Sequence, residues 1–369
     1  MDKKKNYKVA VVGCGRIAGH HNKSIESIEG LEIISFCDLD EEKAKSYGEL
    51  FNLPYFTNYH TMLKKLPEID IVVVATPSGM HFEHSLDFIK KYKKHVIIEK
   101  PTFMKLDHLK NAYDSAEKLG LQIFPIFQNR YNKAVQRVKI ALDKGELGEI
   151  RIINVRLRWC RPQRYYDLSE WRGTFSQDGG AMTNQGIHHI DLLQYLGGDV
   201  KKVNTTLRTL GSEIEVEDCA VSTFCYDNGA IGSLEITTAA RPDDFEASLS
   251  IVGSKGLAQL GGIAVNELQI FSPDPNQCIK WTDDFTDLPK TVRAYGRGHK
   301  ATYKDIANFL FKNIDYPISR SDCLSTIMLL NSFYKSDELG NWVNVDENSQ
   351  SNRLGQENNL LADLYRTFE

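Results

Sequence analysis

The feature that most constrains the fold is a glycine-rich turn directly after the first apolar strand. Residues 8–12 are typical of a buried strand, and the run Gly13-Cys14-Gly15-Arg16-Ile17-Ala18 follows them. This is the G-x-G-x-x-A form of the dinucleotide-binding turn, in which Gly13 permits the sharp turn, Gly15 admits a pyrophosphate and Ala18 keeps the next helix close. Free N–H groups at the start of that helix favour phosphate. The turn therefore predicts a parallel α/β domain that binds a dinucleotide.

The second apolar strand predicts which dinucleotide is bound. It covers Glu32–Cys37 and ends at Asp38, roughly twenty residues after the glycine turn. A carboxylate there accepts hydrogen bonds from a ribose 2′-hydroxyl and repels a 2′-phosphate. We therefore expect NAD rather than NADP, although Arg16 weakens this preference. The alternative is a glycine turn in an α/β domain that binds no nucleotide.

The first third of the chain alternates strands with amphipathic helices. Strands are expected at 8–12, 32–37, 69–75, 96–98 and 123–127, and helices at 41–51, 81–91 and 106–119. This alternation predicts a doubly wound parallel sheet that ends near Tyr131. Ligands collect beyond the carboxyl ends of such strands, where the sequence has Thr76-Pro77-Ser78, Glu99-Lys100-Pro101 and Gln128-Asn129-Arg130. Lys100 is a site candidate on this argument, and a solvated lysine in a turn is the alternative.

The rest of the chain has a different periodicity. After a helix expected at 134–142, strand-type alternation covers 149–159, 220–226, 230–237, 246–252 and 257–260, with a hairpin turn at Asp227-Asn228-Gly229. We expect a second α/β domain with a largely antiparallel open sheet, and helices at 302–313 and 321–335. The polar segment 348–359 is expected to be loosely ordered before a short helical patch at 360–365. The expected divisions are 1–131, 132–340 and a tail at 341–369.

Composition excludes several classes of protein. The formal net charge of −4 shows no bias toward nucleic acid or an anionic membrane. The chain has neither the apolar run of a signal peptide nor a stretch that could span a bilayer. Its seven cysteines form no C-x-x-C pair, which argues against zinc sites and a disulfide framework. We expect a cytoplasmic enzyme with reduced thiols and no nucleic-acid or membrane partner.

A second group of candidate residues follows the glycine pair Gly179-Gly180. On a helix, Asn184, His188 and Asp191 fall at i, i+4 and i+7 on one face, whereas His189 is turned away by about 100°. His188 is the better candidate for removing a proton, because the pKa of histidine lies near neutrality. Metal binding by the two histidines and the aspartate is a rival interpretation, although adjacent histidines on a helix diverge, and we expect no metal. A plain structural histidine is the third possibility.

Together these motifs resemble the Gfo/Idh/MocA oxidoreductases over nearly the whole chain. The resemblance rests on the glycine turn, on Ala75-Thr76-Pro77 with His81 after it, on Glu99-Lys100-Pro101 and on the Asn184…His188…Asp191 segment. It implies that Lys100 and His188 flank the reacting carbon of a sugar or cyclitol, with Asn184 completing the catalytic set. It also implies a set of cofactor contacts: Gly13, Gly15, Arg16, Ile17, Asp38, Thr76, Pro77, His81, Glu99, Lys100, Gln128, Trp171 and Arg172.

Asn184 departs from the pattern of that family, which generally has aspartate four residues before the histidine. An amide cannot supply a negative charge to support an imidazolium. The segments 156–161, 165–167, 170–174 and 184–185 instead resemble the branch that oxidises UDP-N-acetylglucosaminuronic acid at C3. Arg156 and Arg158 alternate onto one strand face, and their forks suit a carboxylate or diphosphate. A solvated face or a subunit contact is the alternative for these two arginines.

The resemblance implies NAD-dependent oxidation of this UDP-linked sugar to its 3-keto form. The substrate would contact Lys100, Arg156, Arg158, Asn184 and His188. It further implies a pyridoxal-phosphate aminotransferase downstream, a role in surface polysaccharides such as the O-antigen of lipopolysaccharide, 2-oxoglutarate as a reoxidant of NADH, and a homo-oligomer, either a dimer or a tetramer. Two alternatives stay open: another sugar or inositol dehydrogenase or ketoreductase of the family, and a dinucleotide-binding sensor without turnover.

Overall fold

The computed structural model describes residues 6–288 and 293–368, and the chain folds into two compact units. Unit 1 holds residues up to Ile126 together with His299–Arg320 and Glu357–Glu369. Unit 2 holds Phe127–Gly298 and Ser321–Gln356. The first unit is therefore discontinuous in sequence, which differs from the expected division into successive segments.

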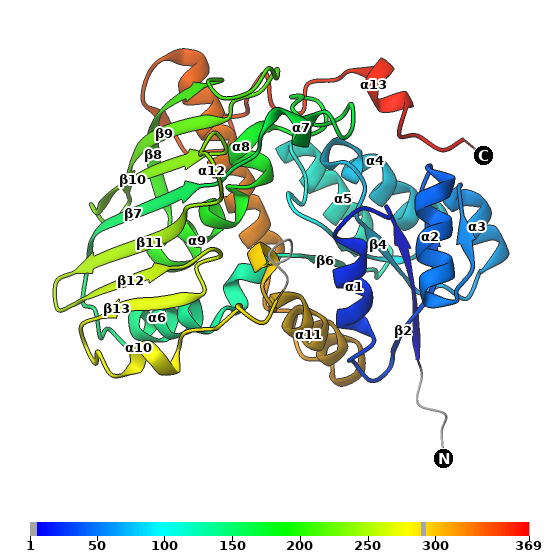
Figure 1. Ribbon diagram of the computed structural model, residues 1–369, viewed down its shortest axis with the longest axis horizontal. Helices are drawn as coiled ribbons and strands as arrows, with labels where there is room; N and C mark the ends of the chain where they lie inside the picture. Colours follow the sequence, from blue (N-terminus) through cyan, green and yellow to red (C-terminus); the bar gives the residue numbers. More distant parts are fainter. Residues whose placement is uncertain (1–5, 289–292, 369) are drawn as a thin grey trace. The chain divides into compact units, whose positions relative to one another are not determined.

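Unit 1 is built on a parallel sheet in the order β3-β2-β1-β4-β5-β6 (Figure 1). Helices α1 and α2 contact β2, and α4 contacts β4 and β5. The central strands are continuous apolar runs, as is usual when helices cover both faces of a sheet. The strands are β1 (Tyr7–Val12), β2 (Leu31–Cys37), β3 (Tyr55–Phe56), β4 (Ile71–Val74), β5 (His95–Ile98) and β6 (Ile123–Pro125). The helices are α1 (Ala18–Ile25), α2 (Glu41–Phe51), α3 (Tyr59–Lys65), η1 (Ser78–Met80), α4 (His81–Leu86), the π-helical η2 (Asp87–Lys91) and α5 (Leu106–Lys118).

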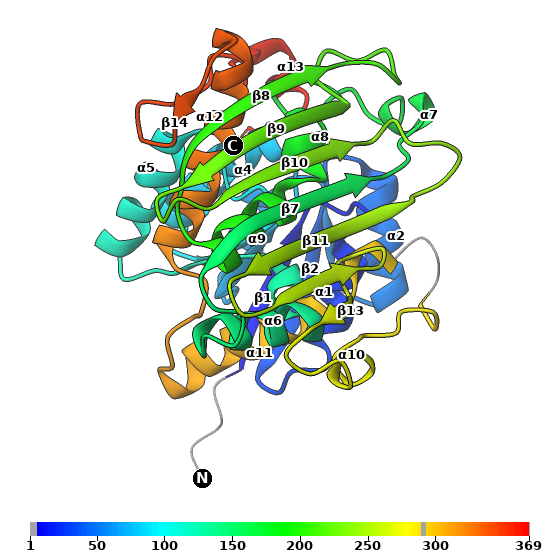
Figure 2. The ribbon, with the colours of Figure 1, turned by 90° about the vertical axis from the view of Figure 1, so that its left-hand side faces the viewer.

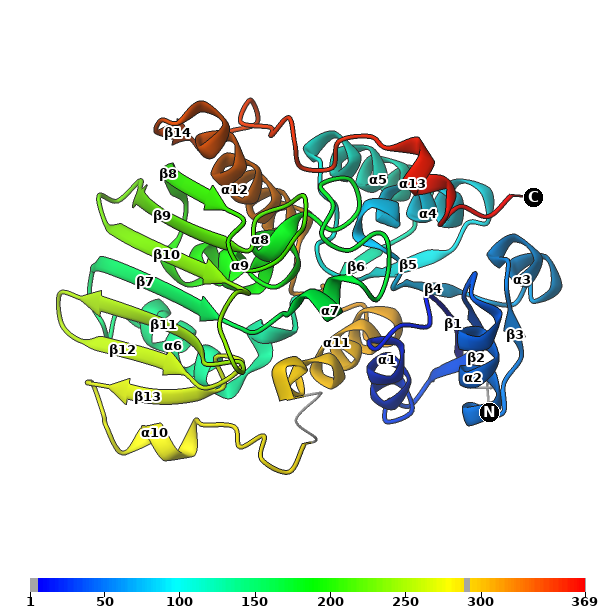
Figure 3. The same ribbon diagram turned by 45° about the horizontal axis from the view of Figure 1, so that its top comes forward.

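Two later segments complete unit 1. Helix α11 (Gly298–Lys312) lies beside α1, as Figures 1 and 3 show. Aromatic side chains join this region to β6, since Phe309 and Tyr316 both pack edge-on against Phe124 at ring separations of 5.4 and 5.3 Å. The short helix α13 (Asn359–Asp363) precedes the final residues, and Arg366 there pairs with Glu83 at 2.9 Å. Aromatic contacts between distant segments thus assign α11 to the first unit, and the periodicity of the sequence could not predict these contacts.

Unit 2 contains a mixed sheet in the order β13-β12-β11-β7-β10-β9-β8-β14, in which β7 and β10 run parallel and their other neighbours run antiparallel. Figure 2 looks onto one face of this sheet, with α6, α8 and α9 behind it. Its strands are β7 (Ile150–Arg158), β8 (Val200–Arg208), β9 (Cys219–Tyr226), β10 (Ile231–Thr237), β11 (Glu246–Gly253), β12 (Leu257–Gly261), β13 (Glu267–Phe271) and β14 (Val343–Asn344). Its helices are η3 (Gln128–Tyr131), α6 (Lys133–Asp143), α7 (Gln163–Tyr166), α8 (Gly180–Asn184), α9 (Ile187–Gly197), α10 (Gln277–Lys280), η4 (Arg293–Tyr295) and α12 (Arg320–Leu339).

The two faces of this sheet differ in burial. On β7, Val155 and Leu157 are buried beneath the helices, whereas Arg156 is exposed. Val221 on β9 and Ile231 on β10 point to the same face as Arg156 and are more than half exposed. The sheet is thus open on one face, as the alternation of its strands predicted.

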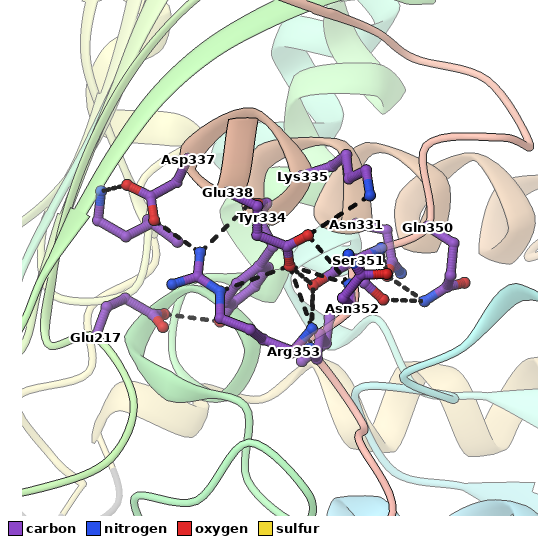
Figure 4. A network of polar contacts seen from close by, with 12 residues as sticks. Glu217, Asn331, Tyr334, Lys335, Asp337, Glu338, Gln350, Ser351, Asn352 and Arg353 are labelled. Atoms are coloured by element: carbon purple, nitrogen blue, oxygen red, sulfur yellow. Dashed lines mark hydrogen bonds and ion pairs between the residues drawn. The ribbon is translucent and has the colours of Figure 1, made fainter. Parts of the chain in front are cut away.

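The segment expected to be loosely ordered is instead tied to α12 (Figure 4). The Glu338 carboxylate accepts hydrogen bonds from the Ser351 hydroxyl at 2.5 Å and from the main-chain N–H groups of Asn352 and Arg353. The guanidinium of Arg353 pairs with Asp337 at 2.7 Å, and Leu354 is fully buried. The expectation of disorder was wrong, because the polar side chains that suggested it find partners on the helix.

No helix in the described part of the chain is long and apolar enough to cross a membrane.

Candidate active site

The glycine turn after β1 has the geometry that a bound pyrophosphate requires. Gly13 has a φ of +100°, and a Cβ on it would lie 2.4 Å from the carbonyl oxygen of Ala75, so only glycine fits there. A Cβ on Gly15 would meet no atom within 4 Å, so the backbone is open to a ligand at this point. Helix α1 begins without a side-chain cap. Its first N–H groups are those that would hold a phosphate.

Asp38 stands at the end of β2 and braces this turn. Its carboxylate accepts a hydrogen bond from the main-chain N–H of Cys14 at 2.7 Å and another from that of Asp40 at 2.9 Å. Each oxygen retains a lone pair, because an ionised carboxylate accepts about four hydrogen bonds. The arrangement is compatible with NAD, and the expected contact of Asp38 with a ribose hydroxyl stays a prediction.

His81 joins the ends of β4 and β5. Its Nδ1 lies 2.8 Å from the carbonyl oxygen of Pro101, and its Nε2 lies 3.1 Å from that of Thr76. The ring is 1 % exposed, and burial lowers its pKa. Nδ1 therefore contacts the residue that follows Lys100, and Nε2 contacts the backbone at the end of β4. In this structure His81 acts as a brace between two strand ends, so its expected contact with the cofactor stays a prediction.

His188 lies near the start of α9, and its partner is Gln128. The two Nε2 atoms are 2.9 Å apart, and both side chains are buried. Because the amide nitrogen of glutamine can only donate, Nε2 of His188 is the acceptor in this pair. The imidazole then carries its proton on Nδ1. Gln128 was expected among the cofactor contacts, and the structure places it against the candidate base.

Asn184 is held by a carboxylate that the sequence analysis did not single out. Its amide donates to Oδ1 of Asp178, and Oδ2 of Asp178 accepts from the main-chain N–H of Gly173 at 2.8 Å. Asn184 ends α8 and His188 belongs to α9, so the expected single helix is interrupted at Gln185-Gly186. A Cβ on Gly186 would lie 2.4 Å from the Ile236 side chain, which explains glycine at the break.

Asp191 is part of a buried ion pair and does not contribute to a metal site. Both of its oxygens accept from the guanidinium of Arg130, at 2.8 and 2.6 Å, and Arg130 also pairs with Asp322 at 2.9 Å. Among the described residues, the group that could ligate a metal through three side chains is His21, Glu99 and His299. The rival interpretation of His188, His189 and Asp191 as metal ligands therefore has no geometric support.

His189 is buried in apolar surroundings. Within the described ranges neither of its ring nitrogens has a hydrogen-bond partner. Burial alone lowers its pKa to about 4. His189 is therefore a neutral packing residue, in contrast to the hydrogen-bonded His188.

Arg156 and Arg158 are not placed with His188. They lie on the open face of the sheet, and α9 packs on the other face (Figure 2). The guanidinium of Arg158 forms a bidentate pair with Glu235 at 2.6 and 2.8 Å and a further contact with Glu246 at 3.2 Å. This position favours a solvated face or a subunit contact over substrate binding.

Trp171 and Arg172 form a cation–π cluster with Tyr165. The guanidinium carbon of Arg172 lies 4.3 Å from the centre of the Tyr165 ring and 4.5 Å from that of Trp171. Its Nη1 donates to the Tyr165 hydroxyl at 2.5 Å. In the described part of the chain Arg172 has no carboxylate partner, and its Nε is buried without an acceptor. A half-buried guanidinium of this kind suits an anionic or carbonyl group of a ligand.

Sequence reasoning missed Asp178 and the pairing of Gln128 with His188. Asp178 stands directly before the glycine pair Gly179-Gly180, so its place in the motif was a usable signal. Gln128 and His188 are 60 residues apart, and no local pattern connects them.

Comparison with known families agrees with this geometry. A profile described as an oxidoreductase family with an NAD-binding Rossmann fold matches residues 7–127, and the profile of the GFO/IDH/MocA C-terminal domain matches residues 135–259. The chain belongs to the Gfo/Idh/MocA family of NAD-dependent oxidoreductases. It is an NAD-dependent sugar dehydrogenase by the same comparisons.

One similar solved structure is the WlbA dehydrogenase of Bordetella pertussis in complex with NADH and UDP-GlcNAcA. It matches with a TM-score of 0.85 and 31 % sequence identity, and the match covers 92 % of this chain and 98 % of that one. The WlbA enzyme of Chromobacterium violaceum, also with NADH and UDP-GlcNAcA, matches at 0.83 and 32 % identity, covering 93 % and 97 %. Glucose-6-phosphate 3-dehydrogenase of Bacillus subtilis is 27 % identical over 75 % of this chain and 85 % of its own length.

Proposed function

We propose that this protein oxidises the 3-hydroxyl of UDP-GlcNAcA with NAD, giving the 3-keto sugar nucleotide. The observation that carries the proposal is the likeness to two dehydrogenases crystallised with NADH and UDP-GlcNAcA, at 31 % and 32 % identity over nearly the whole chain. Levoglucosan dehydrogenase and GenD2 have the same fold at only 19–20 % identity. The difference in identity favours the nucleotide-sugar substrate.

Lys100 and His188 are assigned complementary roles in the proposed reaction. When bound, NAD supplies the acceptor for the hydride that leaves C3. The ammonium of Lys100 donates a hydrogen bond to the hydroxyl oxygen and stabilises negative charge as it develops there. His188 takes the hydroxyl proton as a general base.

The hydrogen bond from Gln128 bears directly on the base. Because Nε2 of His188 accepts from Gln128 at 2.9 Å, this nitrogen has its lone pair available for a proton. A substrate hydroxyl that donates to Nε2 takes the place of the Gln128 amide. Gln128 thus keeps the imidazole in the tautomer that a base requires.

A second function is supported by the curated relatives. Besides the glucose-6-phosphate enzyme, D-glucoside 3-dehydrogenase of Escherichia coli is 29 % identical over 63 % of this chain and 70 % of its own length. Both names describe oxidation at the 3-position of a glucose derivative. A glucose-type 3-dehydrogenase is therefore the second candidate, and the position of the oxidised carbon is common to both.

Substrate profiling of the purified protein tests the proposal. The panel contains UDP-GlcNAcA, UDP-N-acetylglucosamine, which lacks the carboxylate, glucose 6-phosphate, a methyl glucoside and myo-inositol, each with NAD. NADH absorbance and the mass of the sugar product are recorded with and without 2-oxoglutarate, which would sustain turnover if NADH stays bound. Preferred oxidation of UDP-GlcNAcA is expected, and preferred oxidation of either glucose derivative would replace the proposal with the second candidate.

Lys100→Met is the matched control for this assay. The substitution removes the ammonium and leaves the glycine turn that holds the pyrophosphate. We expect kcat to fall by on the order of 10²–10⁴ while the Kd for NAD stays unchanged. Turnover near the wild-type rate would remove Lys100 from the mechanism, and a protein that binds NAD but oxidises nothing in the panel would support a sensor.

A further inference from the structure

A buried carboxylate directly precedes Lys100. Glu99 follows β5 and is 6 % exposed. Its Oε2 accepts a hydrogen bond from the main-chain N–H of Lys100 at 3.1 Å. Its Oε1 lies 3.1 Å from Nε2 of His21 and 3.4 Å from Nε2 of His299. The carboxylate is thus engaged by three protein groups, although the family resemblance implied a cofactor contact.

The two histidines come from segments that are distant in sequence. His21 lies in α1, the helix that follows the glycine turn, and His299 lies in the first turn of α11. One turn further along α11, the hydroxyl of Tyr303 is 2.7 Å from Nδ1 of His21. Figures 1 and 3 show the two helices side by side. Helices α1 and α11 therefore meet at the carboxylate of Glu99.

The protonation states of these groups are mutually consistent. Burial alone would raise the pKa of Glu99, but the hydrogen bonds from His21 and His299 outweigh it and hold that pKa well below its usual range. Burial lowers the pKa of His21. Nδ1 of His21 lies within hydrogen-bond distance of the Tyr303 hydroxyl, and its Nε2 faces the Glu99 carboxylate. The cluster is thus an ionised carboxylate with two buried histidines against it.

We propose that His21 and His299 are positioning residues for Lys100, and that they act by fixing the Glu99 carboxylate to which the main chain of Lys100 is bound. This inference rests on the proposed function, in which the Lys100 ammonium meets the reacting hydroxyl. Lys100 has a long and flexible side chain, so the position of its main chain determines what the ammonium can reach. A displacement of about 1 Å at a catalytic group can lower the rate on the order of a hundredfold.

The alternative use of the cluster is metal binding. The donor atoms of His21, Glu99 and His299 lie within 4.8 Å of one another, a spacing compatible with a divalent cation. Hydrogen bonding explains the contact of His299 with Glu99, and both the second oxygen of Glu99 and Nδ1 of His21 have protein partners. Positioning is therefore the interpretation that we develop, and metal content is measured in its test.

The test compares His299→Gln with His299→Leu in the full-length protein. The amide nitrogen of glutamine can take the place of Nε2 of histidine as a donor, whereas leucine fills a similar volume without one. We expect His299→Leu to lower kcat for UDP-GlcNAcA by about ten- to a hundredfold with KM and the Kd for NAD within about twofold of wild type. His299→Gln should recover most of the lost rate. Equal kcat in wild type and His299→Leu, or equal losses in both variants, would overturn the proposal.

A second measurement does not depend on turnover. Hydrogen–deuterium exchange of the Lys100 amide reports directly on its hydrogen bond to Glu99. Exchange should be faster in His299→Leu than in wild type or His299→Gln, and unchanged exchange would overturn the proposal. If wild type oxidises no sugar nucleotide, the proposed function fails while this exchange still decides the positioning claim. Stoichiometric metal in the purified protein, lost in His299→Leu, would likewise overturn it.

Discussion

Glu217 is the buried carboxylate whose removal gives the sharpest stability prediction. Its Oε1 accepts from the main-chain N–H of Met182, in α8, at 3.0 Å. It also accepts from the Tyr334 hydroxyl at 2.8 Å (Figure 4). A Cβ on Gly180 would lie 2.3 Å from both carboxylate oxygens. Burial raises the pKa of Glu217 to about 8 from the ordinary value of 4.5, and the two hydrogen bonds offset only part of this effect.

A raised pKa makes the folded state bind more protons than the unfolded state between the two pKa values. Stability from this group is therefore complete below about pH 4.5 and is lost progressively as the pH rises toward 8. With 1.36 kcal/mol for each unit of pKa, the free energy of unfolding falls by roughly 2.5 kcal/mol between about pH 5 and about pH 7 from Glu217 alone. Glu217→Gln keeps the acceptor for Met182 and Tyr334 and removes the titration.

Urea unfolding of wild type and Glu217→Gln across this pH range is the measurement. All four tryptophans lie in unit 2, so their fluorescence reports the unit that contains Glu217. Burial lowers the pKa of His189 to about 4, and its titration changes stability in the opposite direction as the pH falls. Subtracting the two proteins removes this common contribution. The difference should grow by roughly 2.5 kcal/mol in favour of the glutamine variant on going from about pH 5 to about pH 7, and a constant difference would refute the argument.

Four further substitutions test the site. Asp38→Ser should relax the preference for NAD, because it removes the charge that repels a 2′-phosphate; equal affinity of wild type for NAD and NADP in titration would contradict the role of Asp38. His188→Ala should lower kcat by on the order of 10²–10⁴, and His189→Ala by much less; a steady-state assay that ranks the two in the reverse order would remove His188 as the base. Arg158→Ala should change the oligomer size in light scattering and leave KM for the sugar nucleotide unaltered, whereas a rise in KM alone would restore the substrate-binding interpretation.

Sequence periodicity predicted the parallel sheet well, because the signal is local. The expected strands at 8–12, 32–37 and 96–98 agree with β1, β2 and β5 to within a residue or two, and the helix at 41–51 matches α2. The turn after β1 could also be predicted from the sequence, because the backbone geometry of the turn requires small residues at its glycine and alanine positions. Strands β3, β8, β13 and β14 were missed, and β8 has polar residues such as Lys202 and Asn204 on its partly exposed face.

Tertiary contacts determine what the sequence could not show. The glycine at the break, Gly186, is required by the approach of the Ile236 side chain from β10, which no local pattern records. The order of the segment 349–354 depends on acceptors such as Glu338, supplied by α12. The pattern around Arg158 does not reveal its ion pairs, because Glu235 and Glu246 come from other strands. In each case the partner that decides the local structure lies on an element distant in sequence.

The family usually has an aspartate at the position of Asn184, and in this chain a nearby residue supplies the carboxylate instead. Asp178, six residues earlier, accepts from the amide nitrogen of Asn184, so the carboxylate that position 184 lacks is one hydrogen bond away. An amide whose N–H group is held by a buried carboxylate is polarised, and its carbonyl oxygen becomes a stronger acceptor. The departure at Asn184 therefore moves the negative charge of the family's aspartate to Asp178 and leaves an amide at position 184.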